Sequence, residues 1–383
     1  MRHSIWILLF GVILTCSRTA RAQYFPPVGT GSWETVDPGQ LGWDGVPPAE
    51  LFAWLELEDT KAFLVLQGGR IVLEHYFGDF EADSSWVWYS AGKSLMAALV
   101  GIAQDEGLLS LDDPTSNYLG RWTLTTRVRE DAITLRHQLT MTSGLDETVA
   151  FACTLRACLQ YRTDPGTRWV YHNGPYNLLT NVVEAASGQD ITVFTESRLG
   201  SKIGLHGYWE PVLFNNFFHS TARGAARFGL LVARGGAWDG TAILADAGSL
   251  TQPSQGLNPS YGHLWWLNGQ SSYIPPGDST SFDGPIAPGA PPDVFVAAGA
   301  QGQFVSVAPS LDLVVVRLGE GRATDLVPLE FHDQMWQRLL AVMGTGTGTG
   351  VAPIQPEQPD WSASPNPASD RVYIRTGEFE GRV

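Results

Sequence analysis

The sequence predicts an α/β (α+β) protein in which one antiparallel sheet, formed by both chain ends, is flanked by helices. Strand-like segments occur early and return late, at 62–66, 70–77, 294–298, 303–307 and 313–318. Between them, from about 111 to 255, we expect a mostly helical insertion. The simplest arrangement for this order of strands, helices and strands is a single sheet built from the two ends of the chain.

The individual elements follow from local patterns. Two apolar runs flank Gln67-Gly68-Gly69, which is a hairpin turn signal. Helix formers with apolar spacing follow Ser90, so a helix is expected from there to about Glu106. Further helices are predicted at 51–58, 133–141, 175–186, 220–234 and 325–343, and a further strand at 261–267.

Residues 1–22 have the features of a secretory signal peptide. Basic residues precede an apolar run over 5–14, and Ala20-Arg21-Ala22 fits a small-residue cleavage site. The apolar run is too short to span a bilayer comfortably. We therefore expect a protein that is secreted, periplasmic or on the surface of a bacterium, with no membrane span after cleavage.

Cleavage would leave Cys153 and Cys158 as the remaining cysteines, because Cys16 lies in the signal peptide. A lipid anchor on Cys16 is the weaker alternative, since Thr15 is larger than the residue that usually precedes a lipidated cysteine. An even pair in an exported protein favours a disulfide. Two unpaired buried thiols are the alternative.

Composition excludes several classes of partner. The 383 residues carry a formal net charge of −15, which argues against nucleic acid and anionic membrane surfaces. The eight histidines show no ligand spacing, so neither a metal nor another cofactor is expected. The remaining partner class is a small-molecule or short peptide-like substrate.

The C-terminal part differs in composition from the domain over 23–343. Residues 344–360 form a Gly/Thr/Pro-rich linker. After it, the stretch Ser-Pro-Asn-Pro-Ala-Ser-Asp-Arg-Val-Tyr-Ile within 361–383 resembles the start of a type IX secretion sorting domain. That resemblance implies secretion machinery as a partner, and a structureless tail is the alternative.

A serine and a lysine three residues apart, Ser90 and Lys93, are the first candidate catalytic pair. On a helix these positions are neighbours, with Cβ atoms about 5–6 Å apart. Lysine, with a pKa of about 10.4 in water, can take the serine proton only if burial or positive charge lowers that pKa. The alternative is that Ser90 is an ordinary N-cap and Lys93 a solvated residue.

Two later segments carry the rest of such a site. Tyr171 and Asn173 form a Tyr-x-Asn on a turn before a helix, where a phenol could relay a proton. Taken singly, Tyr171 would be a core aromatic and Asn173 a turn residue. Small residues over 296–303 would let a substrate lie against a strand edge and offer a backbone N–H for an oxyanion.

With these three segments in order, the chain resembles the serine β-lactamase and penicillin-binding-protein superfamily. The likeness spans roughly 49–343 and is greatest to the class C branch, family VIII esterases and 6-aminohexanoate-dimer hydrolases. It includes the segments 111–114, 139–145, 225–231 and 261–266. It implies a β-lactamase/transpeptidase-like fold.

The resemblance also implies roles for individual residues. Ser90 would be the acylated nucleophile, Lys93 its base, Tyr171 the proton shuttle and Asn173 a site-organising amide. The backbone N–H groups of Ser90 and Ala300 would bind the oxyanion.

One departure from the family bears on the substrate. The Lys-Thr-Gly triplet that meets the β-lactam carboxylate falls on residues 297–299, which are Ala-Ala-Gly here. The resemblance therefore implies a secreted serine hydrolase for esters or amides. The alternatives are a non-catalytic cell-wall or peptide-binding module of the same fold, and a true β-lactamase or D-Ala-D-Ala carboxypeptidase.

Two rival motifs are weak. Gly277-Asp278-Ser279 mimics the serine block of another hydrolase class but lies in a Pro/Gly/Ser-rich loop. The segment 196–199 is similar to a class A deacylation loop, but the class A Ser-Asp-Asn element is absent, so a solvated helical segment is expected.

Overall fold

The computed structural model describes residues 23–29, 31–253, 256–321 and 325–345, together with three strands between 361 and 382. The predicted signal peptide over 1–22 and most of the predicted linker over 344–360 lie outside the described residues. Within the described ranges, no helix combines the length and apolar character needed to cross a bilayer.

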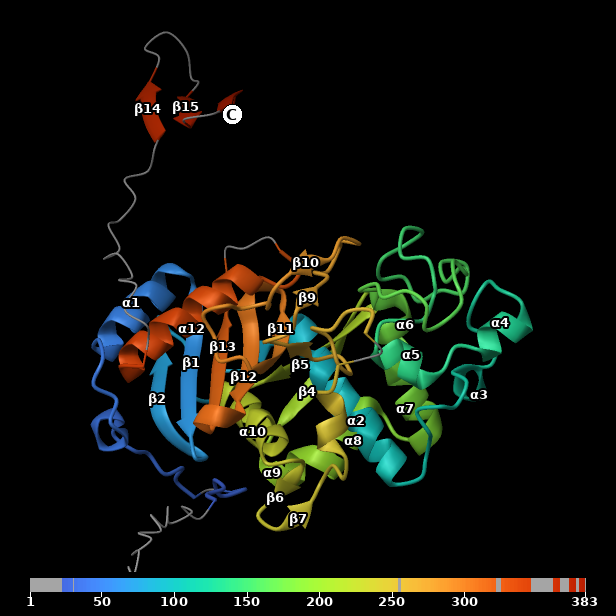
Figure 1. Ribbon diagram of the computed structural model, residues 1–383, viewed down its shortest axis with the longest axis horizontal. Coiled ribbons are helices and arrows are strands. Elements are labelled where there is room, and N and C mark those ends of the chain that lie inside the picture. The colour runs from blue at the N-terminus through green and yellow to red at the C-terminus, as the bar shows by residue number, and fades with distance from the viewer. Residues whose placement is uncertain are drawn as a thin grey trace, which may run out of the picture.

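A six-stranded antiparallel sheet forms the centre of the protein (Figure 1). Its order is β2-β1-β13-β12-β11-β8, so the first two strands of the chain lie beside β13, the last strand of this sheet in chain order. Its strands are β1 (Thr60–Gln67), β2 (Arg70–Tyr76), β8 (Trp266–Leu267), β11 (Phe295–Gly299), β12 (Gln303–Ala308) and β13 (Leu313–Gly319). The predicted fold class, with a sheet built from both chain ends, is confirmed.

Helices cover both faces of this sheet. The long ones are α1 (Pro48–Leu57), α2 (Gly92–Asp105), α10 (Ala222–Ala233) and α12 (Leu329–Met343). Ser306 of β12 lies 2.8 Å from His332 of α12, whereas a Cβ on Gly229 of α10 would come within 2.9 Å of Val305. Since successive strand residues point to opposite faces, α12 and α10 lie on opposite sides of the sheet.

The remaining elements lie mostly between β2 and β11. The short helices are α3 (Ser116–Leu119), α4 (Arg127–Asp131), α5 (Leu135–Leu139), α6 (Asn173–Asn177), α7 (Leu179–Ser187), α8 (Ile191–Thr195), α9 (Ser201–Ile203) and α11 (Ala247–Leu250). The 3₁₀ turns are η1 (Pro38–Leu41), η2 (Tyr89–Ala91), η4 (Ala300–Gly302) and η5 (Pro309–Leu311), and η3 (Glu196–Gly200) is a π-helical turn. The short strands are β3 (Trp86–Val87), β4 (Gly207–Val212), β5 (Asn215–Ser220), β6 (Ala237–Trp238), β7 (Thr241–Ala242), β9 (Ser272–Tyr273) and β10 (Phe282–Asp283).

The region predicted to be mostly helical, about 111–255, therefore also contains strands. The hairpin β4–β5 pairs with β3 in a second antiparallel sheet of order β3-β5-β4. This sheet matters for the site because β3 leads directly into the Ser90 segment.

Two predicted elements are shorter than expected. The helix predicted at 133–141 is α5, which begins after Thr134, where the Thr134 and His137 side chains form a reciprocal capping box. The strand predicted at 261–267 is reduced to β8, because Leu264 has a φ of 60° and turns the chain.

The C-terminal segment forms a separate three-stranded antiparallel sheet. Its strands are β14 (Trp361–Pro365), β15 (Val372–Thr376) and β16 (Phe379–Arg382), paired in that order. The likeness of this segment to a sorting domain stays a prediction.

Candidate active site

Ser90 lies in η2, the 3₁₀ turn between β3 and α2, and is partly exposed. The expected helix start at Ser90 was therefore two residues early, because α2 begins at Gly92. The turn is fixed on its inner side, where the Trp88 N–H donates to the carbonyl of Phe218 on β5 at 2.8 Å. Tyr89 has a φ of 45°, in the left-handed region that disfavours most side chains. Backbone strain of this kind often marks functional turns.

Lys93, on the first turn of α2, is placed to act on Ser90. Its Nζ atom lies 3.0 Å from the Ser90 Oγ atom. The side chain is only 4% exposed, and burial lowers the pKa of Lys93 to about 7. A lysine in water is neutral about once in a few thousand molecules at pH 7, whereas a pKa of about 7 leaves roughly half of them neutral. A neutral amine at hydrogen-bond distance can accept the serine proton.

Two aromatic rings flank the amine. The Lys93 Nζ atom lies 4.2 Å from the ring centre of Tyr176 and 5.2 Å from that of Tyr171. Burial raises the pKa of Tyr171, and a hydrogen bond with Ser90 offsets only part of that rise. The phenol of Tyr171 therefore stays protonated near neutral pH and is suited to relay a proton.

Asn173 begins α6 but is not bonded to Lys93. Its Oδ1 atom is buried and has no hydrogen-bond partner within the part of the chain that the structure describes. The position of α6 is set elsewhere, because Gln138 Nε2 donates to the Pro175 carbonyl at 2.6 Å. The role of Asn173 as a site-organising amide stays a prediction.

The β11 strand passes unusually close to the Ser90 turn. A Cβ on Gly299 would lie 2.4 Å from the Trp88 carbonyl oxygen and 3.1 Å from the Ser90 nitrogen. Only glycine permits this approach, since real Cβ atoms do not come so near. Ser90 and Ala300 each lie at the start of a 3₁₀ turn, where N–H groups lack an intrahelical acceptor. Oxyanion binding would need two such donors near the nucleophile, and the roles of the Ser90 and Ala300 N–H groups stay a prediction.

Arg317, buried in β13, fastens the turn that carries Ala300. Its guanidinium donates to the backbone carbonyls of Gln301, Gly302 (3.3 Å) and Glu58 (2.6 Å). Burial lowers the pKa of Arg317 to about 9, but the side chain is 0% exposed and committed to these carbonyls. It therefore does not supply a free cation in place of the lysine absent from residues 297–299.

The β-lactamase family profile matches residues 60–212, a range that includes the Ser90, Lys93 and Tyr171 segments. An uncharacterized protein from Alkalihalophilus pseudofirmus is 28% identical over 147 residues, which are 36% of this chain and 40% of that protein. The 6-aminohexanoate-dimer hydrolase of Paenarthrobacter ureafaciens is 37% identical over 65 residues, or 17% of each chain. The chain thus aligns with less than half the length of these curated relatives.

Solved structures extend the likeness to most of the chain. A Bacillus anthracis protein provisionally named as a 6-aminohexanoate-dimer hydrolase superposes with a TM-score of 0.64 at 16% identity, covering 85% of this chain and 91% of that one. A class C β-lactamase from Rhodobacter sphaeroides superposes with a TM-score of 0.57 at 16% identity, covering 76% of this chain and 99% of that one. A family VIII carboxylesterase superposes with a TM-score of 0.56 at 16% identity, covering 76% of this chain and 96% of that one. This chain has the β-lactamase/transpeptidase fold.

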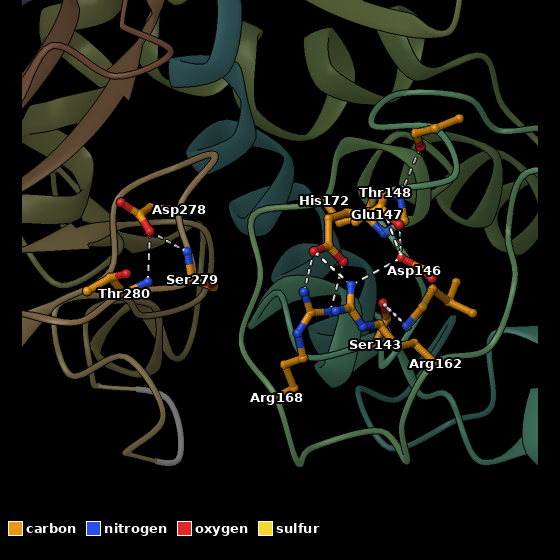
Figure 2. Close-up of polar contacts among 12 residues, drawn as sticks. Ser143, Asp146, Glu147, Thr148, Arg162, Arg168, His172, Asp278, Ser279 and Thr280 are labelled. Carbon is orange, nitrogen blue, oxygen red and sulfur yellow. Dashed lines mark hydrogen bonds and ion pairs between the residues drawn. The ribbon is translucent and has the colours of Figure 1, made fainter.

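In this β-lactamase-fold protein, the segment before Tyr171 is fastened by ion pairs and a disulfide. Figure 2 shows Arg162 and Arg168 directed toward the carboxylates of Asp146 and Glu147. Cys153 and Cys158 are joined, with Cα atoms 6.0 Å apart, as the sequence predicted. The loop between these contacts brings the ring of Phe151 to 6.4 Å from that of Tyr171. These contacts hold the loop against the ring of Tyr171.

The rival motifs have structural explanations. The Asp278 carboxylate accepts hydrogen bonds from the backbone N–H groups of Ser279 and Thr280, so it stabilises its own loop (Figure 2). The segment 196–199 lies in η3, where Arg198 pairs with Glu106 at 2.8 Å. Across the described residues, no three His, Cys, Asp or Glu side chains converge to hold a metal ion.

Sequence reasoning missed three residues of this β-lactamase fold that shape the site. Tyr176 follows Tyr171 by five positions, and an aromatic so near a proposed relay was a signal that could have been used. Gly299 was seen only as a small residue, and Arg317 lies in an apolar strand pattern that gives no sign of what it contacts.

Proposed function

We propose that the protein is a serine hydrolase that cleaves an ester or amide bond through a Ser90 acyl-enzyme, with Lys93 as base and Tyr171 as proton shuttle. One observation carries the proposal: the buried Lys93 amine, with a pKa lowered to about 7, lies 3.0 Å from the Ser90 hydroxyl. Relatives and structural neighbours named as hydrolases, esterases and β-lactamases support it.

The steps follow from the positions of the groups. Lys93 takes the Ser90 proton as Oγ forms a bond to the substrate carbonyl carbon, and the N–H groups of Ser90 and Ala300 stabilise the oxyanion. Lys93 and Tyr171 return the proton to the leaving alcohol or amine as its bond to carbon breaks. Water then attacks the acyl carbon and gives a proton to Lys93 and Tyr171. The bond from this carbon to the Ser90 Oγ atom breaks as Oγ regains a proton, and the acid is released.

A fluorophosphonate probe tests the nucleophile directly. Intact-mass measurement should show one adduct on the wild-type protein and none on Ser90→Ala, whose fold is checked by circular dichroism. Equal labelling of both proteins would remove Ser90 from the mechanism. No labelling of either would favour the alternative of a non-catalytic peptide-binding module.

We propose esters and short amides as substrates rather than β-lactams, because residues 297–299 offer no cation for a carboxylate. Ala297 and Ala298 are buried, with 0% and 3% of their surface exposed. A charged hydrogen bond contributes about 1.5–3 kcal/mol, or roughly ten- to a hundredfold in binding. Short-chain p-nitrophenyl esters should therefore exceed nitrocefin in kcat/KM. Efficient nitrocefin hydrolysis with negligible esterase activity would instead indicate a true β-lactamase.

We further propose export from a bacterial cell, with residues 1–22 removed and residues 361–383 read by secretion machinery. Mass analysis of the protein from its native host should find a mature chain that begins at Gln23. A cell-associated chain that retains residues 1–22 would contradict the export proposal.

A further inference from the structure

The β4–β5 hairpin runs from the candidate active site to an apolar tip. At its base, β5 pairs with β3, and the Trp88 N–H donates to the Phe218 carbonyl next to the Ser90 turn. Toward the tip, Asn215 lies three residues along β5 from Phe218, which is roughly 10 Å. The Asn215 Oδ1 atom accepts a hydrogen bond of 3.2 Å from the Asn177 amide of α6. The tip is therefore held beside α6.

The tip is a two-residue turn made of Leu213 and Phe214. It joins Val212 to Asn215, which face each other in the strand register. Leu213 is 95% exposed, and Val212 and Phe214 are each 40% exposed. Leu213 also has a φ of 56°, in the left-handed region that such turns usually fill with Asn, Asp or Gly. A leucine here gains nothing from the fold, whereas contact with something outside the chain would explain it.

A second apolar segment, 149–152, lies beside the hairpin. Its sequence is Val-Ala-Phe-Ala, and Val149 is 43% exposed. The Asn177 amide that fastens the hairpin also donates to the Ala152 carbonyl at 3.4 Å, so the two segments flank the same side chain. The apolar rim is the name used below for the segments 149–152 and 212–214 together.

The rim has the features of a surface that contacts uncharged, aggregated ester. Neither segment contains a charged residue, and the net charge of −15 disfavours an anionic lipid surface. A stable contact between two proteins buries about 800 Å² on each partner, far more than a narrow hairpin tip offers. A liquid ester surface needs no complementary shape, and it takes up apolar side chains in proportion to their area.

We propose that the apolar rim docks on the surface of emulsified, uncharged esters such as triacylglycerols, so that the hydrolase works at an oil–water interface. This inference rests on the proposed Ser90 mechanism. Docking buries Leu213, and it brings the Ser90 turn, at the base of the same hairpin, toward the ester groups of the surface layer. Phe151, whose ring lies 6.4 Å from that of Tyr171, extends the apolar contact from the rim to the site.

Flotation with triolein droplets measures docking without chemistry when every protein carries Ser90→Ala. Leu213→Asn removes the apolar side chain and introduces a residue that tolerates a positive φ, so the free energy of unfolding should be equal or higher. Partition onto the droplets should nevertheless fall about tenfold or more. Val128→Asn, at a position that is 82% exposed on α4 and outside the rim, is the matched control and should float like Ser90→Ala alone.

Tributyrin tests the consequence for turnover, with Ser90 intact. The wild-type rate should rise steeply once the ester concentration exceeds its solubility limit and droplets form. Leu213→Asn should lack this rise while keeping the wild-type kcat/KM on dissolved p-nitrophenyl acetate. A rise of equal size in both proteins would overturn the role of the rim in turnover.

The outcomes separate docking from chemistry. Equal flotation of Leu213→Asn and Val128→Asn overturns the rim and leaves the proposed hydrolase standing. Binding to anionic phosphatidylglycerol vesicles but not to triolein overturns the uncharged ester as occupant. An oligomer that Leu213→Asn converts to a monomer overturns it in favour of a second copy of the chain. Flotation that depends on Leu213, with no turnover and no labelling of Ser90, overturns the proposed function and leaves the docking surface standing.

Discussion

Lys93 and Arg317 are both enclosed by the fold, yet their surroundings treat the positive charge in opposite ways. Arg317 donates to three backbone carbonyls, so its charge is well solvated by the protein. The Lys93 amine is hydrogen-bonded to Ser90 and lies over the faces of two tyrosine rings. Burial lowers the pKa of Arg317 from 12.5 to about 9 and that of Lys93 from 10.5 to about 7, so the lysine alone of the two has a pKa near neutral pH. Arg317 therefore stays charged at pH 7 and holds backbone carbonyls, whereas the Lys93 amine reaches a pKa at which the proposed role as a base becomes possible.

The sharpest test of this contrast is Lys93→Met, which keeps the length of the side chain and removes the amine. We expect kcat to fall by roughly 10²–10⁴, the usual contribution of a general base. Stability in urea should be unchanged or higher, because a poorly solvated buried charge is removed. Near-normal turnover by Lys93→Met would show that another group deprotonates Ser90.

Arg317→Met should have the reverse effect on stability. It leaves buried carbonyls without donors, and each hydrogen bond to a charged group contributes about 1.5–3 kcal/mol. The free energy of unfolding should fall by at least that amount in urea titrations. Because Arg317 also holds the turn of Ala300, kcat should fall as well. An unchanged unfolding midpoint would contradict this structural role of Arg317.

The pH dependence follows from the lowered pKa of Lys93. The amine is active when neutral, and a base loses its proton as pH rises, so kcat/KM should increase with pH through about 7 and level off above it. At pH 6 the rate constant should be about one-tenth of the plateau. A profile that is flat from pH 5 to 8 would be incompatible with Lys93 as the base.

The smallest expected effect concerns Tyr176, whose ring lies 4.2 Å from the lysine amine. A ring face favours the protonated amine by about 0.5–2 kcal/mol. Tyr176→Leu should therefore lower the pKa of Lys93 and move the acid limb of kcat/KM to lower pH by roughly 0.4 to 1.5 units. Tyr176→Phe keeps the ring and serves as the matched control, with a limb close to that of the wild type. A limb that moves equally in both variants would assign the effect to the hydroxyl instead.

The sequence predicted what depends on near neighbours in the chain. Ser90 and Lys93 are three residues apart, so their contact is local even though Ser90 lies in the 3₁₀ turn before α2, and the strand patterns predicted most of the sheet. The β4–β5 hairpin was missed because its turn contains Leu213 at a φ of 56° rather than the Asn-Gly or Asp-Gly that signals such turns. The partners of Arg317 come from distant segments, and an apolar strand pattern carries no information about them.

The pairing of β1 with β13 also limits how early during synthesis the domain can fold. Thr60 pairs with Gly319 and Gln67 with Leu313, so the first strand must wait for nearly the whole domain to be synthesised before its neighbour arrives. Contacts so far apart in the chain are slow to form, and β1 meanwhile offers an unpaired edge to other chains. Ala300 comes from the same late segment, so a nascent chain would hold Ser90 and Lys93 without the proposed second oxyanion donor. Activity should therefore appear in one step, when the sheet is complete. Before that point, unfinished chains are prone to aggregate.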